Sequence, residues 1–312
     1  MKRTIYKLKF ETGVHFGNGF LSDSESTFQA DTLFSALCIE AIKMGGEEKL
    51  NNFVNAANEG KIKISDSFPY IGKTLFIPKP FIPLEIDKNK KSDSKEKKAY
   101  KKLKYLPIDK LESYLKGNID VISVNKEVVK LGANEERNIA AVRKEEDAEP
   151  YHLGVYRFSD GAGLYVIAEF ENDEYKKLFD ELFKSLSYTG IGGKVSAGLG
   201  RFKIEEDKVS KELNKRFDNA ESSKIKMSLS VSLPKDDEMA CVLENAFYRV
   251  EKRSGFVASE KYSDSLTKKR DLYVIQSGGC FEKVFEGRIV DVSINGAHPV
   301  YRYAKPLFME VM

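Results

Sequence analysis

Gly190-Ile-Gly-Gly-Lys194-Val-Ser-Ala-Gly198-Leu-Gly200, followed at once by Arg201 and Phe202, is the most informative stretch of this chain. Its five glycines allow the backbone to adopt positive φ repeatedly and allow a ligand to approach the peptide groups closely. Before the loop, apolar residues recur at helical spacing, at Tyr175, Leu178, Phe179, Leu182, Phe183 and Leu186. After it, residues 201–205 alternate polar and apolar as a strand does. The pattern predicts a helix over 173–187, a glycine loop and then a strand.

This order of elements argues against a nucleotide-binding fold. Dinucleotide folds and P-loops place a glycine loop between a strand and a helix, so that the phosphate meets the helix N-terminus. Here the helix comes first. Lys194 is followed by Val195, whereas a P-loop requires Ser or Thr at that position.

The elements upstream of the loop complete a recognisable order. We expect a strand over 4–12, a helix over 31–44 with Asp31 as its N-cap and Gly45-Gly46 as its stop, and a second strand over 61–65. A further strand over 164–170 precedes the helix of 173–187. The order β-α-β-β-α-β is that of a ferredoxin-like (RRM-like) domain.

The whole chain is therefore predicted to be an α+β protein with two ferredoxin-like domains. The first covers 1–205 and contains the glycine-rich loop and a long insertion at about 66–160. A polar hinge near 205–223 leads to a second, degraded domain over 220–312. Within the insertion, residues 88–104 are rich in lysine, which is more typical of a solvated loop than of a binding site.

Composition limits the possible functions of the 312-residue chain. A net charge of +3 is too small for attraction of the whole molecule to nucleic acid, so a basic site must be local. Met1-Lys-Arg leads directly into the first strand with no signal peptide, and no apolar run is long enough to span a membrane. We expect a cytoplasmic protein with no membrane partner.

Catalytic and metal-binding patterns are sparse. His15, His152 and His298 are the three histidines, and none has a cysteine or second histidine nearby, so we expect neither a metal nor a cofactor. His15 lies in a glycine-rich turn after the first strand, where a general base for attack by an RNA 2′-hydroxyl could lie. A polar loop histidine that contacts backbone or phosphate is the more economical interpretation.

Cationic and aromatic residues are better arranged for RNA. Lys194 and Arg201 flank the glycine loop, and Arg137 and Arg143 bracket an apolar Ile-Ala-Ala-Val. In the second half, six cations interleave with aromatic residues; the cations are Arg249, Lys252, Arg253, Lys268, Lys269 and Arg270, and the aromatics are Tyr248, Phe256, Tyr262 and Tyr273. Cations for phosphates with aromatics for bases form the usual platform for single-stranded RNA.

A glycine loop after the last helix of a ferredoxin-like fold, with an arginine behind it, resembles the RAMP superfamily of CRISPR proteins. Other stretches look together like the type III-A Csm-complex subunit that holds the crRNA 5′ end. They are Gly13-Val-His-Phe-Gly17, Ala30-Asp-Thr-Leu-Phe-Ser-Ala-Leu37, Ser65-Asp-Ser-Phe-Pro69, Phe76-Ile-Pro-Lys-Pro80, Arg253-Ser-Gly-Phe256 and His298-Pro-Val-Tyr-Arg-Tyr303. The similarity extends over nearly the whole chain except the lysine-rich insertion.

The resemblance implies a non-catalytic scaffold in antiviral defence. It would grip the crRNA 5′ handle, anchor the large polymerase-like Cas subunit, contact the backbone RAMP subunit of the Csm complex, and meet target RNA indirectly. By this resemblance handle phosphates would lie on His15, Phe16, Gly17, Gly192, Gly193, Lys194, Ser196, Gly198, Gly200 and Arg201. Arg253, Ser254 and Phe256 would add contacts from the second domain.

A thumb that wedges into the guide–target duplex would comprise Arg137, Asn138, Ile139, Val142 and Arg143, with Ile139 or Val142 as the apolar wedge. The alternative is a RAMP-type endoribonuclease that processes precursor crRNA. In that enzyme His15 would be the general base and Lys194 would stabilise the developing phosphorane charge.

Overall fold

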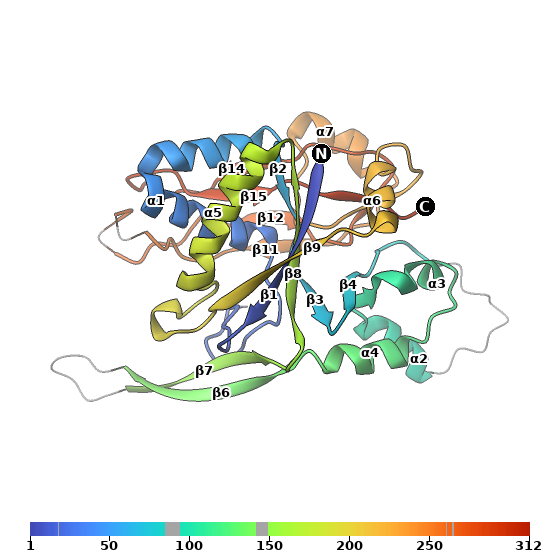
Figure 1. Cartoon of the computed structure of the whole chain (residues 1–312), viewed down its shortest axis with the longest axis horizontal. Coiled ribbons are helices and arrows are strands. Elements are labelled where there is room, and N and C mark those ends of the chain that lie inside the picture. Colours follow the sequence, from blue (N-terminus) through green and yellow to red (C-terminus); the bar gives the residue numbers. More distant parts are fainter. Residues whose placement is uncertain (18, 85–93, 142–148, 260, 264) are drawn as a thin grey trace.

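The structure is a computed structural model that describes residues 1–312 except 18, 85–93, 142–148, 260 and 264. It is a mixed α/β protein with antiparallel sheets (Figure 1). The main sheet has the strand order β5-β4-β3-β8-β1-β9, and β2 also pairs with β8. Its strands are β1 (Lys2–Phe10), β2 (Ile62–Ile64), β3 (Phe68–Ile71), β4 (Thr74–Pro78), β5 (Tyr105–Pro107), β8 (Ala162–Phe170) and β9 (Phe202–Lys208).

The central strand β8 is buried along its whole length, because both faces of the sheet are covered. Successive side chains of a strand point to opposite faces. Leu164 and Val166 therefore join one hydrophobic core with Tyr6 and Leu8 of β1. Tyr165 and Ile167 join a second core on the other face. This arrangement explains why residues 164–170 form a nearly continuous apolar run rather than an alternating one.

Helices α1 (Ala30–Asn58) and α5 (Asp173–Thr189) cover the first of these faces. The predicted helix over 173–187 is confirmed as α5. The predicted stop at Gly45-Gly46 is a kink, where both residues have non-helical φ/ψ, and a second helical segment continues to Asn58. The expectation that Asp31 caps α1 is wrong. The N-cap is Gln29, and the buried Asp31 side chain instead pairs with arginines of the second half.

The insertion contributes both to the sheet and to its second face. The proline-rich segment after residue 65 forms β3 and β4, which extend the sheet edge. Helices α2 (Ser94–Lys102), α3 (Leu111–Leu115) and α4 (Val121–Val129) follow on the right of Figure 1. Strands β6 (Gly132–Ala141) and β7 (Glu149–Phe158) then form a hairpin that projects at the lower left.

The second half packs against both cores rather than standing apart. Its elements are α6 (Lys211–Asp218), β10 (Lys226–Ser228), α7 (Asp236–Leu243), β11 (Val250–Arg253), β12 (Leu272–Ile275), β13 (Cys280–Phe281), β14 (Arg288–Asp291), β15 (Tyr301–Ala304) and β16 (Phe308–Glu310). Tyr303 lies in the first core and Met309 in the second. The expected polar hinge is wrong in one respect, because α6 forms within it and buries Leu213 and Phe217.

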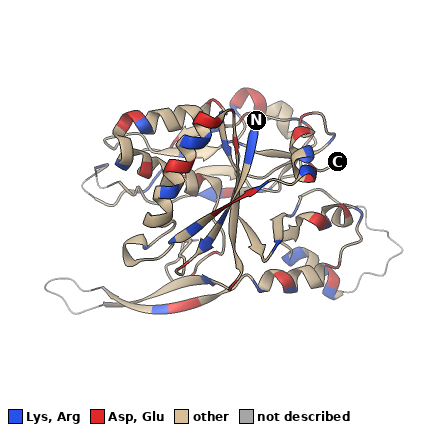
Figure 2. Ribbon diagram, in the orientation of Figure 1, with Lys and Arg blue, Asp and Glu red and all other residues tan. Residues whose placement is uncertain are grey.

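Charged residues are distributed over the whole ribbon, with both signs interspersed (Figure 2). Within the ranges that the structure describes, no helix combines the length and the apolar character needed to cross a bilayer.

Candidate nucleic-acid interface

The glycine-rich loop between α5 and β9 is held against the turn that follows β1. The Gly193 amide donates to the His15 carbonyl at 2.8 Å, and the Gly200 amide donates to the Gly13 carbonyl at 3.0 Å. The loop also closes on itself, because the Ile191 amide donates to the Gly200 carbonyl at 3.0 Å. Two segments that are far apart in the sequence thus form one backbone surface.

Glycine is required at several positions of this loop for different reasons. Gly192 and Gly200 have φ of 106° and 80°. A Cβ on Gly200 would lie 2.2 Å from the Ile191 carbonyl oxygen, and one on Gly192 would lie 2.8 Å from the His15 carbonyl oxygen. Gly198 has φ of 82°, but a Cβ there would meet no atom within 4 Å. Packing therefore fixes Gly192 and Gly200, whereas Gly198 faces open space.

His15 is part of the scaffold of this surface. Its side chain is buried at 6% exposure, and Nδ1 donates to the Gly154 carbonyl of β7 at 2.7 Å. A Cβ on Gly193 would lie 2.7 Å from Cδ2 of the same ring, so the loop packs directly on the imidazole. The imidazole thus joins the turn, the glycine loop and the hairpin.

Phe16 and Gly17 differ in their surroundings. Phe16 is buried, with its ring centroid 5.2 Å from that of Phe28, so its side chain belongs to the core and only its backbone borders the surface. The Phe16 amide donates to Ser24 Oγ at 3.0 Å. Gly17 is exposed beside the His15 ring.

The two cations that flank the loop, Lys194 and Arg201, lie in different environments. Lys194 adopts a left-handed φ of 58°, and its Nζ donates to the Tyr151 hydroxyl at 3.1 Å while lying over the Tyr151 ring. Arg201 is exposed, and its backbone amide donates to Thr12 Oγ1 at 3.2 Å. Its guanidinium has no hydrogen-bond or ion-pair partner among the described residues. Ser196 is exposed on the short 3-10 turn between these cations.

The β6–β7 hairpin starts at this surface and carries part of the predicted thumb. Arg137, Asn138 and Ile139 lie on β6, whereas Val142 and Arg143 fall outside the described residues. Ile139 packs beside Leu153 and Leu199, so it links the hairpin to the glycine loop. Arg137 lies 3.7 Å from Glu135 in a half-exposed ion pair.

The Arg253-Ser-Gly-Phe256 segment is tied to the start of α1. Arg253 Nη2 and Nε donate to the two carboxylate oxygens of Asp31 at 2.7 and 3.0 Å. Arg302 Nη1 donates to Asp31 Oδ2 at 2.9 Å, and its Nη2 donates to the Ser254 carbonyl at 3.2 Å. Phe256 remains 49% exposed, with Lys268 Nζ over its ring. Arg253 and Arg302 therefore hold the segment in place, and Ser254 and Phe256 remain exposed.

The pKa values of the two buried carboxylates at this junction, Asp31 and Asp66, shift in opposite directions. Burial disfavours the charged form of Asp31, but the Arg253 and Arg302 guanidinium groups outweigh it and lower the pKa of Asp31. Asp66 has no cation at ion-pair distance among the described residues. Burial raises its pKa to about 7, although its carboxylate accepts from the Ala30 and Val231 amides at 2.8 and 3.0 Å. Two carboxylates thus connect the first and second halves of the chain.

Sequence reasoning missed Tyr151, Thr12 and Ser24, which support the loop and the turn. Each acts through a contact with a residue distant in the sequence or through its backbone, and no local pattern marks them. Among the described residues, no group of three or more His, Cys, Asp and Glu side chains is placed to hold a metal ion.

Two protein-family models together match most of this chain. The RAMP superfamily model matches residues 7–203, and the CRISPR Csm4 C-terminal domain model matches residues 221–311. The CRISPR system Cms protein Csm4 of Mycobacterium tuberculosis is 37% identical over 99% of this chain and 98% of its own length. The protein of that name from Streptococcus thermophilus is also 37% identical, over 100% of this chain and 99% of its own length.

Solved structures share the fold at lower identity. A chain of the Csm3-Csm4 subcomplex in the type III-A CRISPR-Cas interference complex matches with a TM-score of 0.67 at 19% identity, covering 99% of both chains. A Csm1-Csm4 cassette in complex with cA4 gives a TM-score of 0.61 at 19% identity, over 99% of this chain and 98% of the other. The resemblance to RAMP proteins is thereby confirmed: this chain belongs to the Csm4 family of the RAMP superfamily, a subunit family of type III CRISPR-Cas complexes.

Proposed function

We propose that this protein is a non-catalytic scaffold that grips the crRNA 5′ handle through the glycine loop and the turn after β1. The main support is the joining of these two segments by the Gly193–His15 and Gly200–Gly13 hydrogen bonds. No side chain shields the backbone at the exposed Gly192 or at Gly198, whose Cβ position faces open space. An RNA phosphate can approach such a surface closely, with the exposed Arg201 beside it.

The hairpin β6–β7 fits the role of thumb in this proposal. It projects from the same surface, and Ile139 and Lys194 tie it to the glycine loop. In the assembled complex its distal part would disturb guide–target pairing while its base stays fixed. Arg253, Ser254 and Phe256 would extend the RNA contact from the second half, with Phe256 as a stacking surface.

We also infer a ferredoxin-like arrangement for the first part of the chain. Strand order β9-β1-β8-β2 with α1 and α5 on one face supports it. The boundaries 1–205 and 220–312 stay a prediction, since both hydrophobic cores contain residues from each part. Relatives solved as Csm3-Csm4 and Csm1-Csm4 assemblies support contacts with a backbone subunit and a large subunit.

The endoribonuclease alternative is less well supported by the site. A general base must reach the 2′-hydroxyl of its substrate. The His15 ring is 6% exposed, with Nδ1 bonded to the Gly154 carbonyl and the Gly193 backbone packed on its edge. This environment is that of a structural histidine.

The test is the affinity of the protein for labelled 5′-handle RNA at several salt concentrations. Arg201→Ala should weaken binding and reduce the slope of log K against log salt by roughly 0.7 for the lost phosphate contact. Lys283→Ala, which removes an exposed cation beside β13, is the control and should change neither quantity. Equal affinity of the Arg201→Ala and wild-type proteins would count against the loop as the RNA site.

A further inference from the structure

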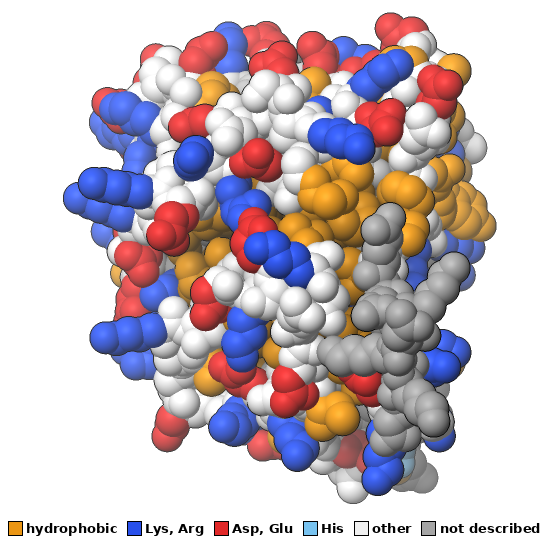
Figure 3. All heavy atoms as spheres, turned by 90° about the vertical axis from the view of Figure 1, so that its right-hand side faces the viewer, with side chains coloured by type: hydrophobic (Ala, Val, Ile, Leu, Met, Phe, Trp, Pro, Cys, Tyr) orange, Lys and Arg blue, Asp and Glu red, His pale blue; other side chains and the backbone are white. Residues whose placement is uncertain are grey.

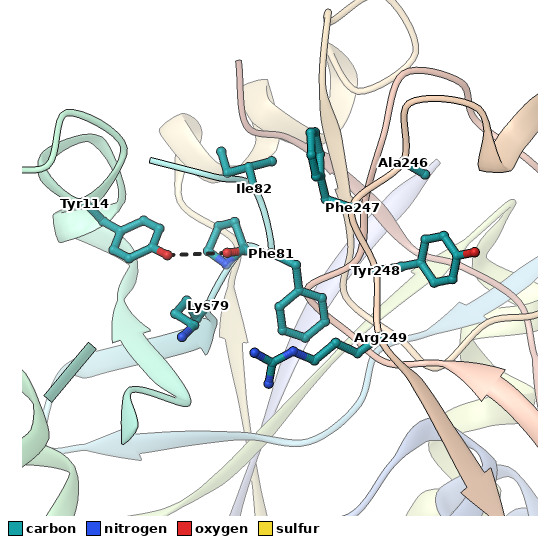
Figure 4. Close-up of a pocket in the computed structure, with 9 residues that line it drawn as sticks. Lys79, Phe81, Ile82, Tyr114, Ala246, Phe247, Tyr248 and Arg249 are labelled. Carbon is teal, nitrogen blue, oxygen red and sulfur yellow. Dashed lines mark hydrogen bonds between the residues drawn. The ribbon is translucent and has the colours of Figure 1, made fainter. Parts of the chain in front are cut away.

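A groove lies between the segment that follows β4 and the segment that precedes β11. Its volume is about 360 Å³, and its lining includes Lys79, Phe81, Tyr114, Phe247, Tyr248 and Arg249 (Figure 4). Both walls are fixed by backbone hydrogen bonds. The Phe81 amide donates to the Gly278 carbonyl at 3.0 Å, and Phe247 exchanges hydrogen bonds of 2.9 Å with Cys280. The groove is therefore a preformed surface feature.

One wall exposes an unusual run of apolar residues. Phe247, Tyr248 and Val250 are 37%, 38% and 53% exposed, with Arg249 between them also exposed. Exposed apolar residues clustered in this way cost solubility unless another surface covers them. Figure 3, which looks onto the right-hand side of Figure 1, shows hydrophobic side chains gathered in the upper right part of that face.

The groove also contains two cations, Lys79 and Arg249. The Arg249 guanidinium lies 5.0 Å from the Phe81 ring centroid, and Lys79 Nζ donates to the Tyr100 carbonyl at 3.0 Å. Within the described ranges, neither has a carboxylate at ion-pair distance. Burial lowers the pKa of Lys79, and the positive charge of Arg249 lowers it further. An incoming carboxylate would relieve this repulsion.

Protein fits this surface better than RNA does. Binding a polyanion requires a continuous basic track. The lining of this groove holds only two cations among the residues that the structure describes. Helix α7, which precedes the groove segment 246–249 in the sequence, is acidic: Glu244 is exposed at its end, and Asp236, Asp237 and Glu238 lie in its first turn. Aliphatic lining by Ile82 and Ala246, together with Phe247, favours an apolar side chain in the groove.

We propose that this groove is a docking site for a protein partner that inserts an apolar side chain flanked by an aspartate or glutamate. The apolar group contacts Phe81 and Phe247, and the carboxylate lies between Lys79 and Arg249. The groove is separate from the glycine loop. The proposal rests on the proposed function only in that the subunits used as binding probes are those of a Csm complex.

The experiment measures binding of the full-length protein to the Csm1-type large subunit and, separately, to the Csm3-type backbone subunit encoded with it. Phe247→Ser and Arg249→Glu are the groove variants. Val129→Ser, at an exposed apolar position of α4, and Lys283→Glu are the matched controls. Each groove variant should bind one of the two subunits at least roughly tenfold more weakly, while both controls bind as the wild type does. Handle RNA affinity should stay within about twofold for all four.

The outcomes separate this proposal from the RNA-binding proposal. If neither subunit binds the wild-type protein, or if both bind Arg249→Glu normally, the docking site is refuted. A loss of RNA affinity in Arg249→Glu would instead identify the groove as a nucleic-acid site, and loss of self-association alone would identify an interface between copies. Should Phe247→Ser fail to fold, Arg249→Glu decides, since its side chain is exposed. Failure of the glycine-loop proposal would instead appear as unchanged RNA affinity in Arg201→Ala.

Discussion

Replacing Asp31 by asparagine tests how the two halves of the chain are joined. The Asp31 carboxylate is 4% exposed and accepts three hydrogen bonds of 2.7–3.0 Å from Arg253 and Arg302. In Asp31→Asn the new side chain would keep the shape of the old one but would turn an amide NH₂ toward a guanidinium group. Two largely buried arginines would then lack their shared anion.

The expected loss in the free energy of unfolding is about 3–5 kcal/mol, the range for a buried ion pair that loses one partner. Asp173→Asn is the matched control, because the Lys2–Asp173 pair has a similar distance of 2.6 Å but side-chain exposures of 60% and 77%. An exposed pair contributes about 0–1 kcal/mol. The same chemical change should therefore have very different effects at the two sites.

Urea unfolding followed by circular dichroism at pH 7 measures both values. The pH dependence adds a check on sign. Since the pKa of Asp31 is lowered in the folded state, its contribution is present above the unfolded pKa of about 3.9 and is lost as pH falls through the folded pKa. A destabilisation of Asp31→Asn within about 1 kcal/mol of that of Asp173→Asn would refute the reasoning.

Further predictions concern the glycine loop, the junction, the thumb and the histidine. Gly200→Ala should destabilise the fold strongly, because its Cβ would lie 2.2 Å from the Ile191 oxygen, whereas Gly198→Ala should cost about 1 kcal/mol and weaken handle binding; thermal melts and RNA titrations separate them. Asp66→Asn should flatten the stability profile between about pH 4 and 8 and gain roughly 2–4 kcal/mol at pH 8. The reason is that a pKa of about 7 makes wild-type stability fully present only below the unfolded pKa and lost as pH rises through 7. Ile139→Gly should change chemical-probing reactivity at the guide position next to the handle, because it removes the apolar contact that fixes the hairpin to Leu199 of the glycine loop, and a wild-type complex with that position paired and unperturbed contradicts the thumb. His15→Ala should lower the melting temperature by removing the buried bond to the Gly154 carbonyl, with no repeat-RNA cleavage before or after the change.

Local patterns predicted those helices and strands in which the spacing of apolar residues follows the faces that are buried. The stripe from Tyr175 to Leu186 became α5, and the apolar run 164–170 became the fully buried strand β8. Gly45-Gly46 marked a real break in helical geometry, and a second helical segment continues after it to Asn58.

Long-range contacts explain most of what the sequence could not predict. Aspartate is a common N-cap residue, yet the Asp31 side chain pairs with Arg253 and Arg302, which lie 222 and 271 residues away. These ion pairs determine its role. Phe16 stands in a turn, yet it packs on Phe28 in the core. The loop was predicted from its glycines, but its attachment to His15 and Gly13 depends on the sheet that brings β1 and β9 together.

Crosslinking of 4-thiouridine-substituted handle RNA to the full-length protein, followed by mass spectrometry of the crosslinked peptides, tests the central claim most directly. The glycine-loop account predicts crosslinks within residues 13–17 and 192–201, and their loss in Gly198→Val. Crosslinks that map instead to the groove at 246–249, with residues 192–201 unmodified, would contradict it.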